Sequence, residues 1–214
     1  EPGHARNAAK LEGALRERNR LLGEPQEPDP QWLDALELQP AEAGAAVAQA
    51  RARLVEWLAQ ALDTLPEAPF ARPVLHYQPG GPLDADALAA ELSLTRRRDR
   101  AAQRTLTGPH RDELGVMMAG KDQPAAECST GEQKAMLIAI TLAHAGLLSP
   151  DRPGLLLLDE VAAHLDPVRR AALFDRLRQG SAQVWLTGTE LPPFDAIAGE
   201  AAIWRVSDGL AERV

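Results

Sequence analysis

Leu155-Leu156-Leu157-Leu158-Asp159-Glu160 joins four consecutive leucines to two acidic residues. A short apolar run without polar alternation is typical of a strand buried on both faces, as in a parallel sheet covered by helices. Ligands of such sheets bind beyond the carboxyl ends of the strands. The stretch therefore predicts an α/β fold with Asp159 and Glu160 at a ligand-binding edge.

The two carboxylates have separate expected roles. Asp159 can hold a Mg²⁺ ion directly or through water, and Glu160 can orient or deprotonate an attacking water. Taken alone, the acidic pair could also end a strand by chance. However, Leu165-Asp166-Pro167 follows at once, and Ser129-Thr130-Gly131-Glu132-Gln133-Lys134 precedes it at the start of an apolar helical run. The order and spacing of the three elements resemble those of ABC-type ATPase heads.

Ser129 and Glu132 fit two compatible roles. Ser-x-x-Glu before an apolar helical run is a capping box, which satisfies free backbone N–H groups. The Ser129 hydroxyl, the Gly131 backbone and the positive end of the helix dipole also form a seat for a terminal phosphate. Apolar residues follow at helical spacing and are expected in the core: Met136, Leu137, Ile140, Leu142 and Ala143.

The segment from Gly115 to Asp122 nearly matches a phosphate-binding loop. Asp122 stands where that loop needs a hydroxyl for Mg²⁺, and its charge would oppose the phosphates. We expect instead a hairpin, with a strand at 114–118, a turn at 119–122 and a short second strand leading to Cys128. The chain would then lack a phosphate-binding loop while carrying the other half of an ATP site.

Composition narrows the class of protein. The single cysteine, Cys128, excludes an internal disulfide, and the sequence has neither a membrane-spanning stretch nor a secretory signal, which predicts a cytoplasmic protein. The formal net charge of −8 argues against a globally basic nucleic-acid binder but allows a local basic face. The start at Glu1-Pro2 and the missing loop suggest a fragment of a longer protein.

Residues 1–104 are expected to form a mainly helical arm domain. A helix is predicted from Ala5 to Leu22, and Asp29-Pro30 begins a second one. That second helix carries a nearly heptad stripe: Val47, Ala50, Leu54, Trp57, Ala61 and Leu65. The stripe fits a short antiparallel arm packed on itself better than a coiled coil with a partner helix.

An arginine cluster closes the arm. A strand is expected at 73–77, and Asp84 caps a helix that continues to Arg104. This helix carries the cluster Arg96, Arg97, Arg98 and Arg100. The cluster could contact a nucleic-acid backbone through phosphates, or it could be an ordinary solvated helix face. No aromatic residue interleaves with it, so base stacking is not indicated.

Residues 105–214 are expected to form the C-terminal lobe of an ATPase head with a mainly parallel sheet. A helix capped by Asp166 should run from Pro167 to Gln179, followed by a strand from Val184 to Thr187. A closing hairpin is expected around Asp208-Gly209. Strands that alternate with helices in this way favour a parallel sheet with helices packed on it.

The sequence resembles the RecF family of bacterial recombination mediators, which have an SMC-like ATPase head. The resemblance rests on residues 106–114, Leu-Thr-Gly-Pro-His-Arg-Asp-Glu-Leu, on the three ATPase elements, and on Thr187-Gly188-Thr189-Glu190. It extends to residues 15–22 and, more weakly, to 77–80, so it covers nearly the whole chain as the C-terminal part of such a protein. The Gly-Pro-His-Arg segment is its most discriminating part.

The resemblance implies an ATP-dependent DNA clamp that loads recombinase at single-strand gaps with RecO and RecR. Such a protein would bind junctions of single- and double-stranded DNA, dimerise around ATP and Mg²⁺, and be a weak DNA-dependent ATPase. Ser129, Gly131 and Glu132 would meet the nucleotide held by the opposite protomer. Asp166 would lie in the dimer-facing loop.

Three departures from the wider ABC pattern are present. Cys128 replaces a leucine, Thr130 replaces a glycine, and no histidine stands at the switch position near Thr187. Thr187 is therefore expected to sense the terminal phosphate, with weaker charge stabilisation and slow turnover. His110 and His164 are alternative sensors, although a lone histidine is more often structural.

Three alternatives remain at this point. An ABC transporter ATPase subunit would share the acidic strand but would show the switch histidine. A chromosome-organising SMC relative would need far longer heptad segments. The third is a non-catalytic arm or partner-binding module, which is how the chain by itself should behave because it lacks the phosphate-binding loop.

Overall fold

The computed structural model describes residues 3–64, 69, 71–147, 154–162 and 165–214. The chain splits into two compact units. The first unit comprises Glu1–Ala59 and Leu75–Val116, and the second unit comprises Gln60–Val74 and Met117–Val214. The expected functional division at residue 104 remains a prediction. In the part of the chain that the structure describes, no helix is both long and apolar enough to cross a membrane.

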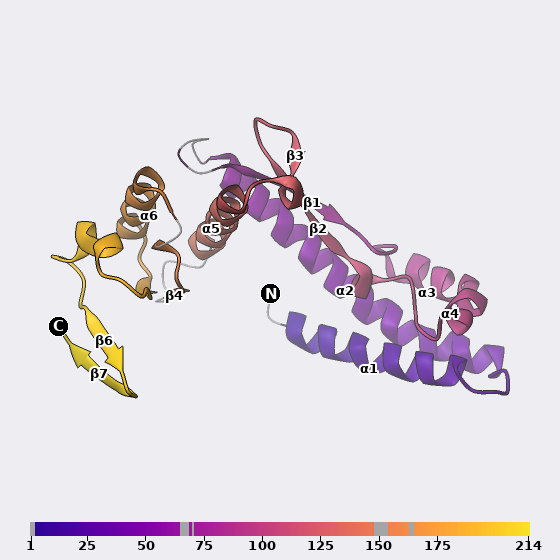
Figure 1. Ribbon diagram of the computed structural model, residues 1–214. Helices are drawn as coiled ribbons and strands as arrows, with labels where there is room; N and C mark the ends of the chain where they lie inside the picture. Colours follow the sequence, from indigo (N-terminus) through magenta and orange to yellow (C-terminus); the bar gives the residue numbers. More distant parts are fainter. Residues whose placement is uncertain (1–2, 65–68, 70, 148–153, 163–164) are drawn as a thin grey trace. The chain divides into compact units, whose positions relative to one another are not determined.

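The first unit is built on two antiparallel helices, α1 (His4–Leu22) and α2 (Pro30–Asp63), drawn in indigo and purple in Figure 1. Leu11 and Leu15 of α1 pack against Val47 of α2, and at the other end Leu21 and Leu22 pack against Leu33. Apolar residues spaced by about one helical turn therefore pack the two helices against each other. This arrangement confirms the prediction of an arm packed on itself.

The buried face of α2 differs from the predicted heptad stripe in its second half. Val47 and Ala50 are buried as expected, but Leu54 and Trp57 are 36% and 47% exposed, whereas Leu58 and Leu62 are buried. A straight helix has 3.6 residues per turn, so a face of constant direction drifts from a seven-residue repeat. The stripe's last member, Leu65, lies outside the described residues.

The expected single helix running to Arg104 is wrong, because it is divided into α3 (Ala85–Leu94) and α4 (Arg96–Ala102). Asp84 caps α3 as predicted, accepting a hydrogen bond from the backbone N–H of Ala87. Thr95 lies between the two helices, and its buried hydroxyl donates to Asp99 over 3.1 Å. Threonine side chains that bond locally compete with helix continuation.

Three strands form a sheet in the order β1 (Pro73–Gln78), β2 (Glu113–Met118) and β3 (Gln123–Pro124). Short 3-10 helices, Pro109–Arg111 and Ala125–Glu127, flank the β2–β3 pair. β2 and β3 are antiparallel, with Met117 opposite Pro124. Gly120 and Asp122 have φ values of 83° and 49°, as a tight turn requires. The segment is thus the predicted hairpin and not a phosphate-binding loop.

The core of the second unit brings α5 (Thr130–Gly146), β4 (Leu155–Leu158), α6 (Pro167–Gln179) and β5 (Gln183–Leu186) together. β4 and β5 are parallel, with Leu158 opposite Leu186. Ile138 of α5, Leu158 of β4 and Phe174 of α6 belong to one buried cluster. Helices α5 and α6 therefore cover the face of the parallel pair that carries Leu158, which confirms the predicted α/β class.

The leucine strand is not buried on both faces, which corrects the sequence prediction. Leu155 and Leu157 are 59% and 68% exposed, and Trp185, opposite Leu157, is 54% exposed. Alternate side chains of a strand point to opposite faces, so Leu156 and Leu158 meet the core while their neighbours point away. Leu137 of α5, also expected in the core, is 64% exposed because the neighbouring Met136 and Ile138 occupy the buried face.

The chain ends in a hairpin of β6 (Trp204–Ser207) and β7 (Leu210–Arg213), after a 3-10 segment at Pro192–Ile197. Asp208 and Gly209 have φ values of 53° and 78°. Two successive positive values are typical of the two-residue turn that suits the twist of a hairpin. The predicted closing hairpin is confirmed.

Candidate functional site

A polar cluster lies at the carboxyl ends of β4 and β5, where the sequence placed it. The hydroxyl of Thr187 donates to Oδ1 of Asp159 and accepts from the backbone N–H of Glu160 over 3.1 Å. The Thr187 N–H in turn donates to the carbonyl of Leu158 over 3.1 Å, which continues the pairing of the parallel strands. Asp159 and Thr187 are exposed, so this strand-end cluster is open to a ligand.

The backbone turns sharply at Glu160, whose φ of 56° lies in the left-handed region. Residues other than glycine seldom adopt this conformation, and such strain concentrates at functional sites. Here the hydrogen bond from the Glu160 N–H to Thr187 stabilises the turn.

Asp159 fits the metal-binding role. Mg²⁺ in nucleotide sites takes one or two carboxylates, and phosphates and water complete its octahedron. Asp159 is exposed and is oriented by Thr187 through one of its oxygens. Across the described residues, no group of three or more acidic, histidine or cysteine side chains could hold a metal by itself.

The predicted capping box is present at the start of α5. The backbone N–H of Glu132 donates to the Ser129 hydroxyl over 3.4 Å, and the N–H of Ser129 donates to Glu132 Oε2 over 3.0 Å. Ser129 is exposed, and Gly131 is partly exposed. The first turn of α5 thus presents its hydroxyl and its positive dipole end to the surface.

A residue that the sequence did not reveal joins this cap. Lys121, at the turn between β2 and β3, has its ammonium 2.5 Å from Glu132 Oε1. The hydrogen bond from Lys121, followed by those from Ser129, lowers the pKa of Glu132 to about 2. The Gly-Lys pair that resembled part of a phosphate-binding loop therefore lies beside the start of α5, where residues 129–134 form the segment that we call the signature.

Asp166 caps α6 and connects to the signature through Arg169. Its carboxylate accepts from the backbone N–H groups of Val168 and Arg169, each over 3.0 Å, and the bond from the Arg169 N–H is the largest of the effects that lower its pKa. The Arg169 side chain is 3.5 Å from Asp166 Oδ2. A Cβ at Gly131 would lie 3.9 Å from Arg169 Nη1. The structure thus places Arg169 beside both predicted nucleotide-contacting elements.

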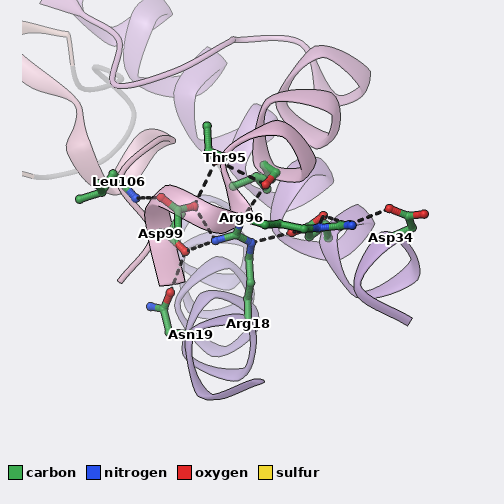
Figure 2. Close-up of polar contacts among 10 residues, drawn as sticks. Arg18, Asn19, Asp34, Thr95, Arg96, Asp99 and Leu106 are labelled. Atoms are coloured by element: carbon green, nitrogen blue, oxygen red, sulfur yellow. Dashed lines mark hydrogen bonds and ion pairs between the residues drawn. The ribbon is translucent and has the colours of Figure 1, made fainter. Parts of the chain in front are cut away.

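Three of the four cluster arginines engage neighbouring elements of the first unit. Arg96 binds Glu37 and Asp34 of α2, and it points toward Asp34 in Figure 2. Arg100 donates to the carbonyl of Glu24 over 2.8 Å, and Arg98 donates to the Thr107 hydroxyl over 2.7 Å. Arg97 and Arg98 are exposed. A role in DNA binding stays a prediction, and these contacts favour Arg97 as the most available side chain.

A buried ion network lies next to this cluster (Figure 2), and sequence reasoning missed it. The Arg18 side chain is fully buried and binds Glu37 and Asp99, each over 2.8 Å. It also donates to the Thr105 hydroxyl and the Leu92 carbonyl, each over 2.7 Å. One side chain therefore ties α1 to α2, α3, α4 and the segment that follows them.

Known proteins resemble this chain over nearly its full length. No family model matches it. The DNA replication and repair protein RecF of Brucella abortus (strain 2308) is 46% identical over 224 residues, an alignment that covers 98% of this chain and 57% of the relative. This chain belongs to the RecF family. The RecF proteins of Mesorhizobium japonicum and Caulobacter vibrioides are each 45% identical, with 98% and 97% of the chain covered.

The chain spans a little under three fifths of the RecF relatives that it matches, 57–58% of their length. A solved structure, described as the recombination mediator protein RecF-ATP in the RecFOR pathway, superposes with a TM-score of 0.80 at 18% identity, covering all of this chain and 59% of that one. At this identity the likeness bears on the fold alone, and it confirms the fold class expected from the sequence.

The segment that best discriminated the RecF family is a structural node. The Asp112 side chain, 5% exposed, accepts from the Tyr77 hydroxyl over 2.6 Å, from the Gly80 N–H over 2.9 Å and from Arg51 over 3.0 Å. Burial, and then the bond to Asp112, raises the pKa of Tyr77. His110 Nε2 lies 2.9 Å from the carbonyl of Thr105, a contact that favours its structural interpretation. His164, the other candidate sensor, lies outside the described residues.

Proposed function

We propose that this chain is part of an ATP-dependent DNA-binding clamp that acts in recombinational repair of single-strand gaps. The relatives are named DNA replication and repair proteins, and the solved structures are described as a recombination mediator in the RecFOR pathway, bound to ATP or ATPγS. The proposed partners are DNA with single-strand/double-strand junctions, RecO, RecR and a second copy of the protein. The proposed location is the cytoplasm.

The observation that carries this proposal is the exposed strand-end cluster. In the proposed reaction Glu160 orients and deprotonates the water that attacks the terminal phosphate of ATP. Asp159 holds Mg²⁺, which neutralises charge on the phosphates. Thr187 fixes Asp159 and the Glu160 backbone at once, through the two bonds of its hydroxyl. A single side chain thus holds the Asp159 carboxylate and the backbone of Glu160.

The signature group is proposed to serve a nucleotide held by the second copy. Ser129, Gly131 and Glu132 lie at the start of α5, where Ser129 is exposed and the other two are partly buried. Arg169 lies close to both Gly131 and Asp166. Backbone N–H groups and the helix dipole at such a terminus favour an anion. If the signature of each copy contacts the ATP held by the other copy, dimerisation depends on the nucleotide.

Hydrolysis is proposed to be slow. Thr187 takes the switch position that carries a histidine in the wider ABC pattern, and a neutral hydroxyl stabilises developing negative charge less than an imidazolium does. Thr187 also already donates to Asp159. Slow turnover suits a clamp whose closed state has to last.

A second proposal concerns this chain by itself, which should act as a non-catalytic binding module. The structure gives residues 113–124 to a hairpin, so they cannot cradle phosphates as a Gly-rich loop would. A hydrolysis assay on the pure 214-residue chain should show no activity above background. Mg²⁺-dependent ATP hydrolysis by that chain would contradict this proposal.

The proposed role of Glu160 is tested by Glu160→Gln in the full-length protein that contains this sequence. The amide keeps the size of the side chain but cannot take a proton from water. ATP-driven dimers should still form and should dissociate more slowly, while steady-state hydrolysis falls by about 10²-fold or more. Glu212→Gln, at an exposed position of the C-terminal hairpin in the same unit, serves as the control. Unchanged hydrolysis in Glu160→Gln would overturn the assignment.

A further inference from the structure

The proposed phosphate seat contains a carboxylate that should repel phosphate. The Glu132 side chain is 17% exposed, and its Oε2 accepts from the Ser129 N–H over 3.0 Å and from the Ser129 hydroxyl over 2.9 Å. A hydroxyl has one proton, so Ser129 cannot donate to Glu132 and to a phosphate together. An uncompensated negative charge at this place would also oppose an approaching anion.

Lys121 is placed to remove this obstacle. It comes from the β2–β3 turn, and its ammonium contacts Oε1 of Glu132, the oxygen that Ser129 does not use. The hydrogen bond to Glu132 raises the pKa of Lys121, and the same contact is the largest of the effects that lower the pKa of Glu132. Both groups are therefore ionised at neutral pH, and together they carry no net charge.

The surroundings of Gly131 show where an anion could approach. Among the described residues, and apart from the backbone of α5 itself, a Cβ added to Gly131 would meet one atom within 4 Å, Arg169 Nη1 at 3.9 Å. Space over the first turn of α5 is thus open, with a guanidinium on one side. With Lys121 paired to Glu132 and Arg169 paired to Asp166, these side chains do not oppose an anion, and the positive end of the α5 dipole favours one.

We propose that Lys121 is a positioning residue of the ATP site. Its ion pair with Glu132 allows the Ser129 hydroxyl to donate its proton to the terminal phosphate of ATP instead of to Glu132. This role rests on the proposed function and is distinct from that of a phosphate-binding-loop lysine. The ammonium weakens Glu132 as an acceptor for the Ser129 proton and offsets its charge. The hydroxyl can then turn toward the phosphate.

A merely structural ion pair makes a different prediction. Exposed pairs contribute little to stability, and the loss of one should leave the ATP requirement unchanged. The proposed role instead predicts a change in nucleotide affinity that depends on the charge of Glu132. A cycle of four proteins separates the two accounts: wild type, Lys121→Met, Glu132→Gln and the double variant.

The measurement is the ATP concentration that gives half-maximal dimer in the full-length protein, by sedimentation velocity at low ionic strength. Lys121→Met should raise it about tenfold, since a charged partner is lost at a site that binds an anion. Lys121→Arg should restore it to within about twofold of wild type, because the positive charge is kept. Lys10→Met, an equal charge change at an exposed position of the first unit, should leave it unchanged.

The double variant distinguishes a purely structural ion pair from the proposed role in ATP binding. Once Glu132→Gln has removed the carboxylate charge, adding Lys121→Met should raise the half-maximal ATP concentration by less than about twofold. An undiminished tenfold effect in that background, or no effect of Lys121→Met alone, would overturn the proposal. If wild type forms no dimer with ATP at any concentration, the proposed function itself fails, and the Lys121 role fails with it.

Discussion

Arg18 and Asp99 in the first unit have fully buried side chains, whereas Ser129, Asp159 and Asp166 in the second unit are exposed. Both regions are rich in charged and polar groups, yet they use them in opposite ways. In the first unit each buried charge has protein partners, as burial demands. In the second unit the polar groups are oriented by hydrogen bonds to neighbours, but part of each side chain remains exposed to solvent. Charges of the first kind stabilise the fold, and those of the second kind form the site proposed to bind ATP.

Arg18 and Arg16 lie on the same helix, and replacing the buried one should destabilise the protein far more than replacing the exposed one. Arg18→Met should lower the free energy of unfolding by about 3–5 kcal/mol, because it leaves Glu37 and Asp99 buried without their cation. Arg16→Met is the matched control, since Arg16 forms an exposed pair with Glu12 and should cost about 0.5 kcal/mol or less. Urea denaturation of both variants measures the difference. Equal losses would show that the network does not hold the first unit together.

The next effect tests the node around Asp112. A Cβ at Gly80 would lie 2.6 Å from the Arg111 backbone carbon and from the Gly108 carbonyl oxygen. The loop that contains Gly80 would therefore have to move away from residues 108–111. Gly80→Ala should destabilise by about 1–3 kcal/mol. Gly13→Ala lies within α1, and no described atom outside the backbone of that helix comes within 4 Å of the new Cβ, so it should instead stabilise by about 0.5–1 kcal/mol. Thermal melts that gave both changes the same sign would refute this account.

Much of this contrast follows from the sequence, and part of it does not. Local rules predicted the capping box at Ser129, the hairpin turns and the strand end at Asp159, because each depends on residues only a few positions apart. The partners of Arg18 lie 19, 74, 81 and 87 residues away, so no spacing rule could find them. Lys121 likewise reaches Glu132 only through the fold of the hairpin.

Two sequence predictions failed for a reason of packing. Four leucines in a row indicated a strand covered on both faces, but the described residues cover one face of β4 and leave Leu155 and Leu157 exposed. Composition reports how apolar a strand is and not which of its faces has a neighbour. The heptad stripe of α2 failed similarly, since a near-repeat of seven cannot show where a straight helix turns its face away.

The smallest expected effect is a pH dependence of the second unit. The folded pKa of Glu132 is lowered to about 2 from an ordinary value of 4.5, chiefly by Lys121. A depressed carboxyl pKa stabilises the fold above pH 4.5, and that contribution is lost as the pH falls toward 2. The melting temperature of wild type should therefore fall more than that of Glu132→Gln between pH 5 and pH 3. Parallel curves for the two proteins would contradict the ion pair.

In the proposed dimer, the signature of one copy and the strand-end carboxylates of the other meet at the same nucleotide. Mixing two inactive full-length variants, Ser129→Arg and Glu160→Gln, tests it most directly through steady-state ATP hydrolysis. A mixed dimer would contain one composite site with an intact Ser129 from one copy and an intact Glu160 from the other. We expect that mixing restores hydrolysis that neither variant shows alone. A mixture as inactive as its two components would contradict it.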